Sequence, residues 1–302
     1  MTNKASNYIG SVGNGQINNL LPIHVNSTHY IAPDETEWLR TGTTLYDEYG
    51  EYPDATPYTG IPGDFGYTGT SFNVSFVSYS PQGMIWDGTF FWIVDFTEEN
   101  VNKYDADGNY TNFSFSIVDN VVEPRGLAYD DTFLWIIDGS DNFVKQYDFN
   151  GNYTGTSFYV GTQEDTPTGI TWDGTSFWVI GSDQATAFKY NSDGSYANVS
   201  FDITPQDNSP SSICWDGTSF YVTGYTDAMV YKYNENGVYS NESFSVDDQT
   251  SEPRVITWDG TNIWVIGGIS DIVYQYNIEY PPYVGIDTPY FKSGIPIYTR
   301  IK

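Results

Sequence analysis

Short runs of apolar and aromatic residues, separated by turn-forming residues, recur through most of the chain. One representative unit has four such runs, at residues 169–172, 176–180, 185–190 and 196–201. The runs are rich in aromatic and β-branched residues, which favour strands, and Asp, Gly, Ser and Asn lie between them. The pattern therefore predicts four short β-strands, which we name A to D, joined by tight turns.

This unit returns at a constant spacing. A Trp-Asp-Gly-Thr word, replaced by Tyr-Asp-Asp-Thr in one copy, ends strand A of each unit, and each word begins 43 residues after the previous one. The words begin at Trp86, Tyr129, Trp172, Trp215 and Trp258. A period of about 40 to 45 residues with four strands is typical of a β-propeller blade. The sequence thus predicts an all-β fold, a five-bladed β-propeller over residues 65–280.

The array is out of phase with complete blades at both ends. Residues 67–76 match strand D of the other units but have no strands A to C before them. Residues 255–277 supply strands A to C without a strand D. We therefore expect the N-terminal strand to complete the last blade, because this closure leaves no sheet edge unpaired.

The segments on either side of the array lack the repeat. Residues 1–64 are predicted to form an N-terminal attachment arm or small β unit, and residues 281–302 a C-terminal strand or tail that packs with it. Ring closure brings both segments to the same blade, so we expect a small β attachment module built from both termini. His24 and His29 have neither Cys nor regularly spaced acids near them, and no metal site is predicted there.

Composition restricts the partners. The chain has 11 basic and 39 acidic side chains and a formal net charge of -28, which disfavours binding to nucleic acid or to an anionic membrane surface. No apolar segment approaches about 18 residues and the first residues lack a signal-peptide pattern, so neither membrane insertion nor signal-dependent export is expected. Cys214, the one cysteine, takes a strand A position that Ile, Ala or Thr fills in the other units, which predicts a buried structural residue.

No pattern of residues predicts catalysis or a cofactor. The strand A positions expected to face the channel carry small, hydroxyl and aliphatic side chains, without an acid or histidine. The Asp of each word is present in all five units, and capping of the following turn explains it. These residues are Asp87, Asp130, Asp173, Asp216 and Asp259. Residues 105–109 resemble part of a calcium loop but lack the downstream Glu, so a weak cation site in one blade stays an alternative.

Strand B carries an aromatic residue at one fixed position in every unit. The residues are Trp92, Trp135, Trp178, Tyr221 and Trp264. Large rings at a constant position on a blade predict packing between blades, and ligand stacking is the alternative.

The units differ most between strands B and C. In a propeller these loops share one face with the connectors from D to A, while the opposite face carries the nearly constant turns. Positions that vary in a strict array are the ones available for binding, and exposed rings beside polar groups suit a saccharide. The candidate binding residues on this face are Phe96, Phe143, Tyr225, Asp183, Asp227, Arg125 and Arg254.

The tandem words Pro-x-Gly-Ile-x-Trp-Asp-Gly-Thr-x-Phe-Trp-Val, with Val-Tyr-Lys-Tyr-Asn and Gly-x-Tyr between them, resemble propeller repeats in virion and tail proteins of tailed bacteriophages. Residues 35–43 and 298–302 are similar to segments that accompany such repeats. The resemblance implies a non-enzymatic structural protein of the virion, in a tail fibre, another tail-associated part or the capsid surface. It would be present in many copies, bind other virion proteins through its termini, and contact a host-surface saccharide or a neighbouring subunit.

Two other functions stay open. A hydrolase or lactonase could draw its catalytic groups from the variable loops. A capsid decoration protein would need no ligand at all. Fold resemblance alone does not choose among these functions, because propellers host many of them.

Overall fold

The computed structural model describes residues 66–278 in full, and outside that range the backbone of several short strands. Its contacts divide the chain into two compact units, Phe65–Ile278 and a second one formed by Met1–Asp64 with Glu279–Lys302. All described elements are strands. Within this described part, no helix has the length and hydropathy needed to cross a membrane.

The second unit contains strands from both ends of the chain. They are β1 (His24–Val25), β2 (His29–Ile31), β3 (Glu37–Arg40), β4 (Tyr46–Asp47), β5 (Gly50–Glu51), β6 (Pro57–Tyr58) and β27 (Tyr298–Arg300). β27 pairs antiparallel with β3 in a sheet of order β1-β6-β2-β3-β27, and β4 pairs with β5. The predicted small β module from both termini is thus confirmed as a fold. The side chains of His24 and His29 lie outside the described residues.

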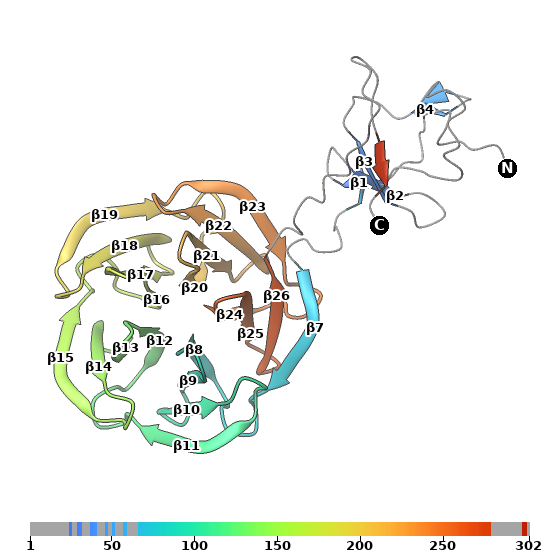
Figure 1. Ribbon diagram of the computed structural model, residues 1–302. Helices are drawn as coiled ribbons and strands as arrows, with labels where there is room; N and C mark the ends of the chain where they lie inside the picture. The colour runs from blue at the N-terminus through green and yellow to red at the C-terminus, as the bar shows by residue number, and fades with distance from the viewer. Residues whose placement is uncertain are drawn as a thin grey trace. The chain divides into compact units, whose positions relative to one another are not determined.

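The first unit is the predicted five-bladed propeller (Figure 1). Blade 1 consists of β8 (Pro81–Trp86), β9 (Phe91–Asp95), β10 (Asn100–Tyr104) and β11 (Tyr110–Ser116). Blade 2 consists of β12 (Pro124–Tyr129), β13 (Leu134–Asp138), β14 (Phe143–Tyr147) and β15 (Tyr153–Tyr159). Blade 3 consists of β16 (Pro167–Trp172), β17 (Ser176–Gly181), β18 (Thr186–Asn191) and β19 (Tyr196–Asp202). Blade 4 consists of β20 (Pro210–Trp215), β21 (Ser219–Gly224), β22 (Met229–Asn234) and β23 (Tyr239–Ser245).

Blade 5 is built from both ends of the array. It consists of β24 (Pro253–Trp258), β25 (Asn262–Gly267), β26 (Ile272–Asn277) and β7 (Gly66–Asn73). β7 pairs antiparallel with β26, with Asn73 opposite Ile272 and Tyr67 opposite Tyr276. The predicted closure of the last blade by the N-terminal strand of the array is therefore confirmed, and Figure 1 shows β7 beside β26 at the ring's outer edge.

The innermost strands β8, β12, β16, β20 and β24 surround the channel, each in contact with the next. Glycine lets two of these strands approach closely. A Cβ atom added at Gly83 of β8 would lie 2.5 Å from the backbone nitrogen of Leu127 in β12. At Gly126, which has the same place in blade 2, the nearest atoms would be 3.1 Å away.

Gly83→Ala is expected to lower the free energy of unfolding by about 1–3 kcal/mol, because the backbones of β8 and β12 would have to separate. Gly126→Ala is the matched control, and its cost should be well below that of Gly83→Ala. Urea unfolding monitored by tryptophan fluorescence measures both. Equal costs would contradict the close approach between blades 1 and 2.

The strand B aromatic column packs between blades, as predicted. The Trp135 ring centroid lies 4.9 Å from that of Phe177 in blade 3, and Trp178 lies 5.0 Å from Phe220 in blade 4. Trp264 of blade 5 lies 5.1 Å from Phe91 of blade 1, so the same contact crosses the closure. Five apolar clusters of this kind, one at each blade interface, form the core of the propeller.

The repeated Asp of each word caps its turn, which confirms that prediction. In blade 1, Asp87 Oδ1 accepts hydrogen bonds from the backbone N–H groups of Thr89 and Phe90, each at 2.8 Å. Asp87 Oδ2 accepts the indole N–H of Trp92 at 2.7 Å. The variant Asp131 has a left-handed φ of +70°, and glycine is also left-handed in the other four turns, with φ from +92° to +98°. Asp tolerates this region. The second blade therefore keeps the same turn.

Candidate functional site

Loops and connectors of every blade are tied together on one face of the propeller. The residue that follows strand B donates its backbone N–H to the backbone carbonyl of the residue before strand A. Gly139 donates in this way to Glu123, and Gly268 to Glu252, both at 2.8 Å. We call this side the loop face. It comprises residues 96–99, 139–142, 182–185, 225–228 and 268–271 with the connectors that precede each strand A. The opposite side, with the A–B and C–D turns, is the turn face.

The channel opens on the loop face in a cavity of about 290 Å³. Every blade supplies to its wall the residue that follows the first proline of strand A. These are Gln82, Arg125, Thr168, Ser211 and Arg254. Ser182, Ser209, Pro210 and Tyr225 complete the lining, and we call the whole set the polar mouth.

Three of the predicted binding residues, Arg125, Arg254 and Tyr225, come together in the polar mouth. Phe96 adjoins it, because the Arg125 guanidinium carbon lies 5.3 Å from the centroid of the Phe96 ring. Phe96 and Tyr225 are both half-buried. The structure thus groups four of the seven candidates around one opening.

The other three candidates do not line this mouth. Phe143 begins β14 and packs against Tyr159, with ring centroids 5.2 Å apart. Asp183 and Asp227 are exposed on their loops. Asp227 accepts hydrogen bonds from the Tyr231 hydroxyl and from the Met229 backbone N–H, so its carboxylate also orders its own loop.

Sequence reasoning missed the other polar residues of the mouth. Thr168 donates its hydroxyl to the Pro210 carbonyl at 3.2 Å, and Ser211 donates to the Pro253 carbonyl at 2.7 Å. Each bond therefore joins one blade to the next at the rim. The sign in the sequence was available, since these residues follow the repeated proline and differ between units.

Several loop-face acids are buried and hold the backbone rather than face a ligand. Glu164 is fully buried and accepts the backbone N–H groups of Thr166 and Gln184. Asp207 accepts the Ser209 N–H and the Thr226 hydroxyl, and burial raises its pKa. These two acids serve the loops in blades 3 and 4, as Asp95 and Asp138 do in blades 1 and 2.

Two groups of acids have a geometry or sequence that could suit a cation. The carboxylates of Glu164, Asp165 and Asp183 lie within 4.8 Å of one another. Glu164 already accepts backbone N–H groups, as described above. Asp105, the first residue of the calcium-loop fragment, accepts the backbone N–H of Asn109 at 2.8 Å and of Asp107 at 3.0 Å. Its carboxylate therefore caps the C–D turn of blade 1.

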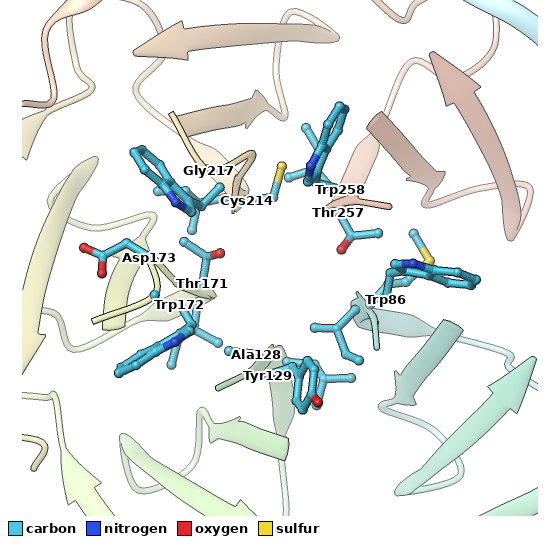
Figure 2. Close-up of a pocket in the computed structure, with 18 of the residues that line it drawn as sticks. Trp86, Ala128, Tyr129, Thr171, Trp172, Asp173, Cys214, Gly217, Thr257 and Trp258 are labelled. Carbon is cyan, nitrogen blue, oxygen red and sulfur yellow. The ribbon is translucent and has the colours of Figure 1, made fainter. Parts of the chain in front are cut away.

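The channel's opposite end, on the turn face, widens into a cavity of about 410 Å³. The aromatic residues that begin the five words surround it, and Figure 2 labels Trp86, Tyr129, Trp172 and Trp258 around the opening. Cys214 lies in this wall, where burial raises the pKa of its thiol. The predicted buried place of Cys214 is confirmed. The aromatic residues of this wall are nearly the same in all blades. The repeat of the fold therefore explains them, and they do not mark one side of the channel as a binding site.

No protein-family model matches the chain, and no curated protein matches it. Among solved structures, the chain resembles Myxococcus xanthus glutaminyl cyclase at a TM-score of 0.58 and 10% identity, over 72% of this chain and 98% of that one. Virginiamycin B lyase from Staphylococcus aureus matches at a TM-score of 0.45 and 15% identity, over 85% and 95% of the two chains. A regucalcin from Agrobacterium tumefaciens matches at 0.48 and 10% identity, over 74% and 99%. The similarity to the glutaminyl cyclase, at 10% identity, shows the fold alone.

Proposed function

We propose that the protein is a non-enzymatic structural protein of a bacteriophage virion, whose propeller binds a saccharide of the host surface through the loop face. The observation that supports binding is the difference between the two faces. The loops and the polar mouth differ from blade to blade, whereas the A–B turns of the other face keep nearly the same word and one geometry. Packing of the blades does not require this contrast, because all five blades have the same strand arrangement.

The viral part of the proposal rests on the resemblance of the repeats to those of phage virion and tail proteins. In this proposal the unit that contains β1 to β6 and β27 binds other virion proteins, and the propeller projects from the particle. A single saccharide contact is weak, since one stacked ring with its hydrogen bonds contributes roughly 1–3 kcal/mol. Many copies on one particle would therefore supply useful affinity by acting together.

Replacing Phe96 and Tyr225 together by alanine is expected to reduce binding to a saccharide at least tenfold while the protein stays folded. Both rings are half-buried on the loop face, so little core packing is lost. The measurement is binding of the fluorescently labelled, tetramerised full chain to an array of bacterial surface polysaccharides. Val238→Ala is the control, since Val238 is an exposed apolar residue on the turn face.

Each result of the array has a different consequence. Loss of binding in the double variant, with normal binding by Val238→Ala, would support recognition by the loop face. Equal binding by both variants would contradict it. Absence of binding to any polysaccharide would favour the decoration protein, and release of cleaved sugar from the array would favour the hydrolase.

A further inference from the structure

Two blades share a set of residues that the other three lack. Blade 2 has Glu123-Pro-Arg125 and blade 5 has Glu252-Pro-Arg254, and a glycine follows strand B in both, Gly139 and Gly268. In the other blades the residue pairs at the arginine and glycine positions are Gln82 with Phe96, Thr168 with Ser182, and Ser211 with Tyr225. The same strands form in all five blades, so the fold does not need this set.

The two glycines make room for the two arginines. A Cβ atom at Gly139 would lie 2.9 Å from Arg125 Cγ, and one at Gly268 would lie 2.6 Å from Arg254 Cδ. Neither glycine has the left-handed φ that would explain it by backbone conformation. Each arginine side chain therefore lies across the glycine backbone, and this close approach explains the glycine.

Both arginines line the same cavity. β8 contacts β12 on one side and β24 on the other, so Arg125 and Arg254 flank Gln82 of blade 1. They are the two arginines of residues 66–278, and no carboxylate belongs to the described lining of the polar mouth. A protein of net charge -28 thus places two guanidinium groups at one opening, each beside one glutamate.

The arginines keep donors for a ligand. Arg125 Nη2 lies 3.1 Å from a Glu123 carboxylate oxygen, and Arg254 Nη2 lies 3.7 Å from Glu252. A guanidinium has five N–H donors, and these single contacts leave most of them available. Glu123 and the Phe96 ring hold Arg125 in place, which reduces the entropy that binding would cost.

We infer that the polar mouth binds the carboxylate of an acidic sugar between Arg125 and Arg254. Planar guanidinium groups match carboxylates through paired hydrogen bonds. The Tyr225, Ser182 and Ser209 side chains of the same cavity supply hydroxyls for the sugar's own hydroxyls. The inference rests on the proposed saccharide-binding function and adds the chemical class of the ligand.

The test is titration of the full chain with methyl glucuronide, with the neutral methyl glucoside as a comparison, followed by NMR. Binding of the glucuronide should exceed that of the glucoside at least tenfold and should weaken as salt is added. Arg125→Gln and Arg254→Gln should each weaken it about tenfold to a hundredfold, because each removes charge-assisted hydrogen bonds. The fold tolerates glutamine at this position, because blade 1 has Gln82 there.

Glu98→Gln is the matched control, because it removes a charge from an exposed loop-face residue of blade 1 without removing a donor of the mouth. It should bind the glucuronide as tightly as the unchanged protein or more tightly. Equal binding of both sugars, unaffected by Arg→Gln, would overturn the carboxylate inference, while array binding would still support the saccharide function. Inorganic phosphate that displaces the glucuronide at equal concentration would also overturn it, in favour of a phosphate-bearing ligand.

Discussion

Deletion of residues 66–73 is expected to lower the melting temperature by more than about 10 °C or to cause aggregation, the largest effect predicted for this protein. The deletion removes β7, which forms the outer edge of blade 5. β26 would then present unpaired N–H and C=O groups, and Phe72 would no longer cover Phe91 and Trp264, whose centroids lie 5.5 and 5.6 Å from its own. Differential scanning calorimetry and light scattering measure both outcomes.

A variant with the strand kept but one of its exposed side chains changed is the control. Thr70→Ala alters an exposed residue in the middle of β7 and should change stability by less than about 0.5 kcal/mol. Together the two results separate backbone pairing and Phe72 packing from the exposed surface of the strand. A deleted protein that melts like the unchanged one would show that blade 5 does not need β7.

Replacement of Lys145 by methionine is expected to lower the free energy of unfolding by about 3–5 kcal/mol. Lys145 Nζ donates to Asp138 at 2.8 Å, to Asp141 at 2.7 Å and to the Asn120 carbonyl at 2.6 Å. The Asp138 side chain is only 1% exposed, so the variant would keep a buried carboxylate without its cation. Methionine fills similar space, which keeps the loss of packing small. Urea unfolding at pH 7 measures the change.

The pH dependence of this stability loss shows whether the unpaired, buried Asp138 carboxylate causes it. Burial raises the pKa of Asp138, but hydrogen bonds from Lys145 and Ser140 outweigh it and lower the pKa from 3.8 to about 2. A carboxyl with a lowered folded pKa adds stability that is present above its unfolded pKa, near pH 4, and is lost as the pH falls through 2. Without Lys145, only the hydrogen bonds from Ser140 and the backbone oppose burial, so the pKa of Asp138 should rise and protonation should relieve the buried charge at a higher pH. The deficit of Lys145→Met should therefore shrink between pH 7 and pH 3.

Two further variants serve as controls for this pair. Asp138→Asn in the Lys145→Met background should recover part of the lost stability, because it neutralises the unpaired carboxylate. Lys232→Met affects a half-exposed pair with Glu242 and should cost less than about 1 kcal/mol. A deficit of Lys145→Met that is constant with pH would mean that lost packing, rather than the buried charge, is responsible.

The fold could be predicted from the sequence because the array repeats its local rules without insertion. A 43-residue period places each turn Asp and each strand B aromatic at the same point of every blade, and the structure confirms both roles. The phase of the first and last units was enough to predict β7 in blade 5. The packing between blades could also be predicted, because the five interfaces repeat one arrangement and a single pattern of side chains had to fit all of them.

The candidate site could be predicted only in part, because it depends on which positions face each other across a loop. Glu164 and Asp207 look like exposed loop acids in the sequence, yet they are buried. Gly181 and Gly224 lie opposite and leave the space, and a Cβ at either glycine would overlap the acid. In blades 1 and 2 the acid comes from strand B itself, as Asp95 and Asp138. The spacing of residues along the chain does not reveal that the buried acid lies on strand B in blades 1 and 2 but on the connector before strand A in blades 3 and 4.

The place of Phe143 could not be predicted for a related reason. It follows a polar loop in the sequence and looks like a loop residue, but the structure begins β14 there. Its ring packs on Tyr159 of the next strand rather than at the channel. The polar mouth, in contrast, lies at the start of strand A, where Thr168 and Ser211 seem unremarkable until five blades bring them into one ring.

The pairing of β7 with β26 also sets an order of folding during synthesis. β7 leaves the ribosome roughly 200 residues before its partner, which at about 5–20 residues per second is an interval of about 10–40 s. Blades 1 to 4 can each form from consecutive residues in that time, so closure of the ring is the last step. Meanwhile β7 must avoid pairing with a neighbouring nascent chain. The sequence of β7 is mostly polar, with Tyr67 and Phe72 as its only large rings. This suits a strand that stays exposed to solvent until its partner has been synthesised.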